Sequence, residues 1–164
     1  MKLRQMTLTT LAAALIFVTT IIIQIPNGIG GYIHMGDALL ITFAMLLPSR
    51  SAFFAAAMGS SMADLMSGYT IYIIPTFIIK GCMSLCFHHH THTSKVSNML
   101  SMLASCIILV GGYFITECIL YQSVATAAIS ILPNIIQVGF GCVVAYMLYP
   151  IMERLLQSIF KKVI

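Results

Sequence analysis

Two short glycine-containing loops hold the side chains best suited to binding a small molecule. Tyr32, His34 and Asp37 lie in and just after the first loop, and Asp64 and Tyr69 flank a glycine in the second. Tyrosine rings stack on flat heterocycles, while carboxylate, imidazole and hydroxyl groups form hydrogen bonds. The neighbouring sequence is apolar enough for lipid, and polar groups that bracket membrane helices usually mark a ligand site. We therefore predict that these five residues line a binding pocket.

Four further polar residues lie later in the chain, within apolar segments. Lys80 falls eight residues into its segment, about 12 Å deep at 1.5 Å per residue, where a charge needs a partner. Glu117 lies about one turn from the end of the next segment. Asn134 and Gln137 are three residues apart and share a helix face, and amides can both donate to and accept from a pyridine or pyrimidine ring. With residues 27–36 as a glycine-rich lid, these residues complete a predicted outward-opening pocket.

Structural roles are the alternative for several of these residues. Asp37 and Asp64 could cap helix ends. Lys80 could form a buried ion pair with an acidic residue, which would offset the cost of burying its charge as well as a ligand contact would. His34 could be a solvated loop residue, and Asn134 could cap a helix that starts after a proline. The sequence alone leaves these alternatives open.

The composition indicates which elements position these side chains. Hydrophobic residues make up 60% of the chain and charged residues 7%, which is typical of an integral membrane protein. The chain has room for about six spans of roughly 20 residues but not for a soluble catalytic or nucleotide-binding domain, so any energy source would be another subunit. We predict an all-α fold of six transmembrane helices in a single membrane domain, over residues 8–25, 37–47, 51–67, 72–87, 97–121 and 125–159.

The basic residues predict the orientation of these helices. If the segments alternate across the bilayer from a cytoplasmic N-terminus, seven of the eight basic residues lie in the cytoplasm and the C-terminus is cytoplasmic too. Asp37, Asp64 and Glu117 then lie toward the outer side. Orientation explains the positive charge more simply than nucleic-acid binding does, so no nucleic-acid partner is predicted. The seven bases are Lys2, Arg4, Arg50, Lys95, Arg154, Lys161 and Lys162.

Rows of small residues predict close helix contacts. Residues 52–64 carry alanine, glycine and serine at four-residue intervals, a pattern that lets membrane helices approach closely. The helix over 8–25 has two shorter rows near its cytoplasmic end, Thr9 with Ala13 and Thr10 with Ala14. For these four residues, docking to another subunit and internal packing are both open.

Four separated motifs follow one another in the chain: Gly31-Tyr32-Ile33-His34-Met35-Gly36-Asp37-Ala38, Ala63-Asp64-Leu65-Met66-Ser67-Gly68-Tyr69, Pro75-Thr76-Phe77-Ile78-Ile79-Lys80-Gly81, and Gly112-Tyr113-Phe114 with Glu117. In their order and spacing, over roughly residues 8–152, they resemble the substrate-binding S component of energy-coupling factor (ECF) vitamin transporters. Where that family has an Ala-xxx-Ala pattern in the first helix, this chain has Thr9-xxx-Ala13 or Thr10-xxx-Ala14.

The resemblance implies a six-helix S-component fold in a bacterial or archaeal cell membrane. It also implies capture of a vitamin or its precursor at the outer face, and partnership with one transmembrane T subunit and two ATPase subunits. Pyridoxine, hydroxymethylpyrimidine and riboflavin are the solutes that the resemblance favours, all flat heterocycles. A multiply anionic solute such as folate fits less well, since the outer side is acidic. No cofactor is expected.

Two other functions stay open beside transport. Cys82 and Cys86 precede a histidine cluster, and together they could bind zinc, nickel or copper in a metal-binding or metal-transport protein; the histidines are His88, His89, His90 and His92. A structural membrane subunit without a ligand is the second alternative, although the polar residues gathered on one side argue against it. Enzyme activity is not predicted, because the chain has no P-loop, Gly-x-Ser-x-Gly or paired-carboxylate motif.

Overall fold

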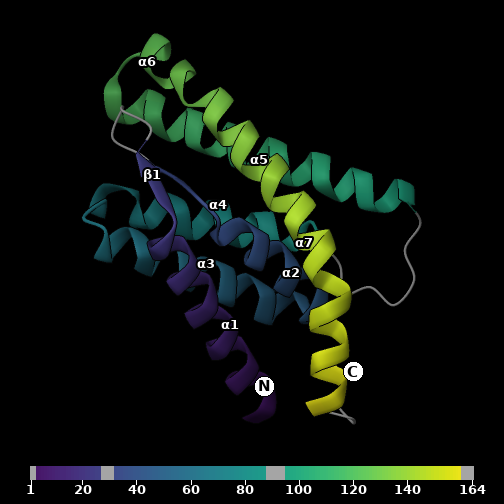
Figure 1. The fold of residues 1–164 in the computed structure, drawn as a ribbon. Helices are drawn as coiled ribbons and strands as arrows, with labels where there is room; N and C mark the ends of the chain where they lie inside the picture. The colour runs from purple at the N-terminus through teal and green to yellow at the C-terminus, as the bar shows by residue number, and fades with distance from the viewer. Residues whose placement is uncertain (1–2, 27–31, 88–94, 160–164) are drawn as a thin grey trace.

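The protein is a helical bundle with one short β-hairpin (Figure 1). The computed structural model describes residues 3–26, 32–87 and 95–159. An antiparallel hairpin places Ile25 opposite Ile33. The elements are α1 Leu3–Ile22, β1 Gln24–Pro26, β2 Tyr32–His34, α2 Gly36–Leu46, α3 Ser49–Met66, the 3-10 turn η1 Thr70–Tyr72, α4 Ile73–Leu85, α5 Lys95–Tyr121, α6 Val124–Ile129 and α7 Ile131–Ile159.

Two predicted helices differ from those in the structure. The helix predicted over 8–25 begins earlier, at Leu3, and ends at Ile22, and its last predicted residues form β1 instead. Pro26 explains the change, because the residue before a proline is pushed toward extended backbone. The helix predicted over 125–159 is divided at Ser130 into α6 and α7, and α6 starts on Ser123, whose side-chain oxygen accepts the Thr126 N–H at 3.3 Å.

The two ends of the described chain lie at one end of the molecule, while β1 and α6 lie at the other (Figure 1). Helix α3 packs against both α1 and α4. Gly59 makes the α1 contact possible, since a Cβ there would lie 2.6 Å from the Ala13 carbonyl oxygen. The prediction of close packing through small residues of α3 is therefore confirmed.

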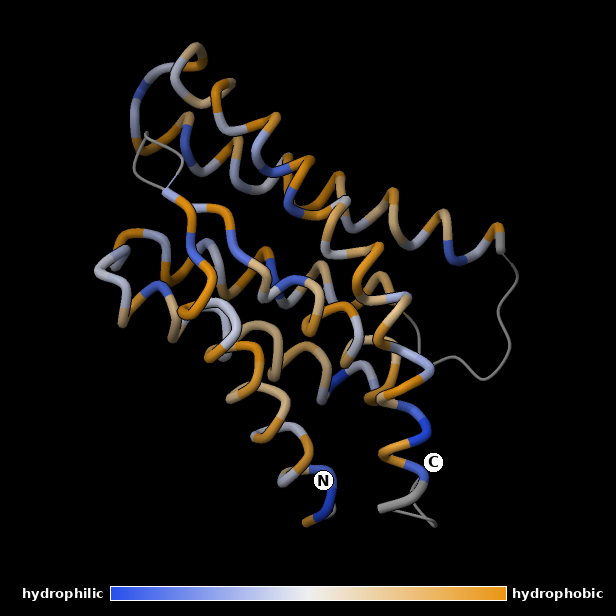
Figure 2. The backbone as a smooth tube through the Cα atoms, viewed as in Figure 1, coloured by the Kyte–Doolittle hydropathy of each residue, from blue (hydrophilic) through white to orange (hydrophobic). Residues whose placement is uncertain are grey.

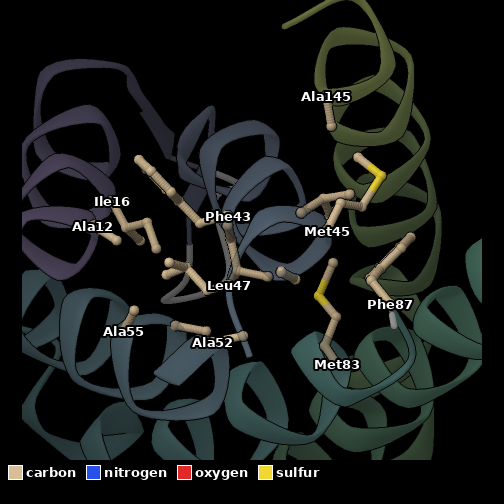
Figure 3. Close-up of a cluster of buried hydrophobic side chains, with 14 of the residues drawn as sticks. Ala12, Ile16, Phe43, Met45, Leu47, Ala52, Ala55, Met83, Phe87 and Ala145 are labelled. Atoms are coloured by element: carbon tan, nitrogen blue, oxygen red, sulfur yellow. The ribbon is translucent and has the colours of Figure 1, made fainter. Parts of the chain in front are cut away.

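Helix α2 lies inside the bundle. Every α2 residue except Leu39 is buried, and α2 contacts α1, α3, α4 and α7. Figure 3 shows the apolar cluster around it, in which Phe43 and Leu47 meet Ile16 of α1 and Met83 meets Phe87 near the end of α4. This core fixes α2 so that its first turn, which carries Asp37, sits in the centre of the protein.

The outer surface is apolar, as expected for a protein that lies in lipid. Ile22, Ile74, Ile107 and Leu132 are each more than 60% exposed, whereas hydrophilic residues concentrate at the two chain ends and inside the bundle (Figure 2). Among the described residues, three helices are long and apolar enough to cross a membrane, over Leu3–Ile22, Val96–Tyr121 and Val124–Gln157. Helix α2 and residues 70–85 are apolar but shorter.

Candidate functional site

A partly open polar cavity lies where the hairpin meets the ends of four helices. It is lined by side chains from β2, from the C-terminal ends of α3 and α5, from the N-terminal ends of α4 and α7, and from the loop and 3-10 turn before α4. Four tyrosines, two carboxylates and two amides face it, an arrangement that combines stacking surfaces with hydrogen-bonding groups. The lining residues are Tyr32, His34, Asp64, Tyr69, Tyr72, Thr76, Tyr113, Glu117, Asn134 and Gln137.

Seven of the nine residues singled out in the sequence line this cavity, and two lie behind it. Those two, Asp37 and Lys80, form a buried ion pair with 2.6 Å between Nζ and Oδ1. Both side chains are 0–1% exposed. The structure thus favours the ion-pair alternative for Lys80, and neither residue reaches the cavity surface.

Gln137 connects this ion pair to the hairpin. Its amide nitrogen donates to Asp37 Oδ2 at 2.7 Å, and its amide oxygen accepts the backbone N–H of His34 at 3.1 Å. The Gly36 N–H in turn donates to His34 Nδ1 at 3.1 Å, which requires that nitrogen to be unprotonated. Burial lowers the pKa of His34 to about 4, with Asp37 acting in the opposite sense. His34 is therefore a neutral, buried ring and not a solvated loop residue.

Tyr32 attaches the hairpin to α3 beside the cavity. Its hydroxyl donates to Asp64 Oδ1 at 2.6 Å, and the centroid of its ring lies 4.8 Å from the centroid of the Tyr69 ring. Burial and the Asp64 carboxylate raise the pKa of Tyr32, so the hydroxyl keeps its proton. Gln24 of β1 adds a second link, donating to the Ser67 hydroxyl at 2.8 Å. These contacts hold the hairpin over the cavity.

The opposite wall contains hydroxyl pairs and Glu117. Ser130 donates to Glu117 Oε2, and the Thr76 and Tyr113 hydroxyls lie 3.0 Å apart. Three lining residues, Tyr72, Thr76 and Tyr113, are not among the nine that the sequence singled out. For two of them a signal was present, because Tyr72, Thr76 and Lys80 recur every four residues and so form a polar stripe that runs from η1 along α4.

The structure decides whether Asn134 caps a helix. Asn134 lies inside α7, with its backbone N–H bonded to the Ser130 carbonyl at 3.0 Å, so it does not cap a helix start. The hydroxyl of Tyr72 lies 2.9 Å from that of Tyr121. Asn134 therefore directs its amide at the cavity from a fixed position on a helix.

The cavity is small in this ligand-free form. Its volume is about 40 Å³, enough for a few water molecules. Small-molecule sites usually have volumes of roughly 300 Å³ or more. A ligand would therefore have to displace side chains around the cavity, and Tyr32 and Tyr69 are the two tyrosines in its lining that lie outside the helices. Residues 27–31 of the predicted lid lie outside the described residues.

The other predicted sites are far from this cavity. On α1, Thr10 and Ala14 are exposed, whereas Thr9 and Ala13 are half-buried and Ala13 faces Gly59 of α3. Cys82 and Cys86 are half-buried near the end of α4. In the described part of the chain, no three His, Cys, Asp or Glu residues are placed to hold a metal ion. Four candidate ligands, His88, His89, His90 and His92, lie outside the described residues.

An apolar exterior and a polar cavity at one end of the bundle define a small helical membrane protein with a site suited to a solute. Residues 1–154 match the family described as the S component of the ECF-type riboflavin transporter. The chain therefore belongs to the family of ECF transporter S components, as its sequence motifs indicated. This is a transport family, not an enzyme family.

The chain is also similar to two other proteins. It is 28% identical over 155 residues to the thiamine precursor transporter HmpT of Lactococcus lactis subsp. cremoris, which covers 93% of this chain and 90% of that protein. It is also 31% identical over 108 residues to an uncharacterized protein in gap 3'region from Pyrococcus woesei, covering 63% of this chain and 72% of that protein. The first match spans every element that lines the cavity.

Proposed function

We propose that this chain captures a single-ring heteroaromatic vitamin or vitamin precursor, of the hydroxymethylpyrimidine or pyridoxine class, for ATP-driven import. The observation that carries the proposal is the cavity itself: four tyrosine rings, two amides and two carboxylates around a small space. Stacking together with a few hydrogen bonds suits a flat, weakly charged heterocycle. All nine predicted site residues belong to this cavity or to the ion pair behind it.

Cavity size supports a single ring over a larger solute. Starting from about 40 Å³, a monocyclic ligand needs less displacement of the surrounding side chains than a tricyclic flavin does. The thiamine precursor named for the Lactococcus relative agrees with a small solute. Riboflavin, which the family description names, is the second candidate, and it requires a wider opening between the hairpin and α3.

We propose the following membrane arrangement: six crossings, with both termini in the cytoplasm and the cavity facing outward. Arg4 at the start of α1, Arg50 at the start of α3 and Arg154 near the end of α7 support it, because positive charge accumulates on the cytoplasmic side. The cavity lies at the opposite ends of these three helices. Delivery would then require a T subunit and two ATPases, the partners that the resemblance to S components implies.

The exposed row of Thr10 and Ala14 is our proposed docking face for the T subunit. Small exposed residues on a membrane helix permit close approach by another helix. The row of Thr9 and Ala13 is less suitable, because α3 already covers it.

Release of the bound solute tests this function directly. The protein is purified in mild detergent and denatured, and the released small molecules are identified by mass spectrometry and absorbance. A stoichiometric single-ring heterocycle is the expected result. A flavin would replace the single-ring assignment with riboflavin, and bound transition metal without any heterocycle would contradict the transport proposal.

Two variants link the solute to the cavity. We expect Asn134→Ala and Glu117→Ala to weaken binding of the identified solute at least tenfold, because each removes a polar group that faces the cavity. Gln157→Ala is the matched control, an amide truncation at an exposed position on the far end of α7. Unchanged affinity in both cavity variants, with normal helical content, would refute the site.

A further inference from the structure

One oxygen of Asp64 has no partner although it is buried. The residue is 5% exposed, its Oδ1 accepts from Tyr32, and its Oδ2 has no hydrogen-bond partner among the described residues. Thr76 is a neighbouring donor, and its hydroxyl lies 3.0 Å from that of Tyr113 but forms no hydrogen bond with Asp64 Oδ2. A buried carboxylate oxygen without a partner costs stability, so its persistence beside a cavity points to a partner that arrives with the ligand.

The position of Asp64 on its helix argues against a structural role. It lies in the last turn of α3, which ends at Met66, and a negative charge is disfavoured at a helix C-terminus by the helix dipole. Its backbone carbonyl already accepts the Tyr69 N–H at 2.8 Å, but the side chain caps no backbone group. Capping, which would give the carboxylate a purely structural purpose, therefore does not explain it.

The electrostatics of the cavity define what Asp64 can bind. Among the described residues that line the cavity, none is lysine or arginine. Lys80 lies behind the wall and is paired with Asp37 at 2.6 Å. Asp64 and Glu117 thus face the space together with the negative faces of tyrosine rings. Such a site favours N–H donors and positive charge, and it disfavours carboxylate or phosphate groups on a ligand.

We infer that Asp64 is the specificity-determining residue of this pocket: its Oδ2 accepts a hydrogen bond from an amino group on the ring of the solute. The inference rests on the proposed capture of a single-ring heterocycle and narrows that class to amino-substituted rings, with aminopyrimidines preferred over rings that carry an oxo group at the same place. A site built around a ligand N–H rejects an analogue that lacks it, because the buried acceptor is then left without a partner.

A single-group exchange in the ligand tests this assignment. Hydroxymethylpyrimidine carries a ring amino group, and its analogue with an oxo group in that position has nearly the same size. We measure the affinity of both probes for the full-length protein in mild detergent by isothermal titration calorimetry. Wild type should bind the amino probe about 10- to 100-fold more tightly, and Asp64→Asn should reduce this preference to within about threefold, because an amide offers a donor as well as an acceptor.

A control variant and the wild-type preference itself keep the test decisive. Glu153→Gln is the matched control, because Glu153 also accepts from a tyrosine hydroxyl, that of Tyr149 at 3.1 Å, but lies far along α7; it should keep the full preference. The preference of the wild-type protein for the amino probe tests the assignment even where Asp64→Asn does not fold.

The outcomes separate the inference from the proposed function. Equal affinity of wild type for the two probes, or an Asp64→Asn variant that keeps the full preference, would overturn the role of Asp64 while single-ring capture stands. Binding of neither probe, with riboflavin bound instead, would refute both the inference and the single-ring assignment.

Discussion

Lys80→Met should destabilise the protein strongly, because it leaves a buried carboxylate without its counter-charge. The Lys80 and Asp37 side chains are 0% and 1% exposed and 2.6 Å apart, and after the change the Gln137 amide is the side-chain donor that Asp37 keeps among the described residues. Removing one partner of a buried ion pair typically costs about 3–5 kcal/mol. With about 2–4 °C of Tm per kcal/mol for a chain of this size, the expected loss is about 6–20 °C.

Thermal unfolding in mild detergent, followed by circular dichroism of the helices, measures this effect. The chain has no tryptophan, so intrinsic fluorescence is a weaker probe. Arg4→Met is the matched control, because Arg4 is exposed at the start of α1 and its removal should change the unfolding free energy by less than about 0.5 kcal/mol.

The double variant Lys80→Met/Asp37→Asn tests the cause of the loss. It leaves no buried charge, and an asparagine oxygen can still accept from Gln137, so we expect it to recover more than half of the lost stability. Two results would refute the reasoning: a cost below about 1 kcal/mol for Lys80→Met, or a double variant no more stable than the single one. Either would mean that water or detergent reaches Asp37.

Two more predictions concern the hairpin and the α1–α3 contact. The folded pKa of His34, about 4, lies below its ordinary value of 6.5, so its contribution to stability is complete above pH 6.5 and is lost as the pH falls toward 4. The unfolding free energy lost in this way is about 3 kcal/mol. His34→Gln should therefore make the Tm less dependent on pH in this range. Gly59→Ala should lower the Tm, because the new Cβ would lie 2.6 Å from the Ala13 carbonyl oxygen. Gly139→Ala should leave the Tm unchanged or raise it slightly, because the added Cβ would have no neighbouring atom within 4 Å. Equal effects of the two substitutions would contradict the packing explanation.

Membrane chemistry explains why much of the site was predictable from sequence. In a chain with only 7% charged residues, each polar group inside an apolar segment is costly, so few are present without a purpose. Glu117 and Gln137 were identified on this ground, and both line the cavity. Tyr72 and Thr76 were missed because a hydroxyl group costs little free energy inside a membrane helix, so its presence there does not by itself indicate a site.

Other features depend on tertiary placement and could not be predicted. Lys80 had three acidic candidates as partners, and the choice of Asp37, 43 residues away, follows from α2 lying inside the bundle. The role of Gln137 as a link between Asp37 and the hairpin needs contacts across 100 residues or more. Strand β1 was assigned to a helix because its isoleucine-rich neighbourhood continues the apolar run of α1.

A cavity of about 40 Å³ is too small for a ring, so the side chains that line it have to move apart before a solute can enter. The rate of capture then depends on how often the cavity widens, and the measured affinity equals the intrinsic one reduced by the fraction of molecules in the wide form. We therefore expect the observed association rate to rise with solute concentration and then reach a plateau set by this widening. The same rearrangement has to occur before the solute leaves, so a closed cavity that limits capture would also retain a scarce solute after it has bound.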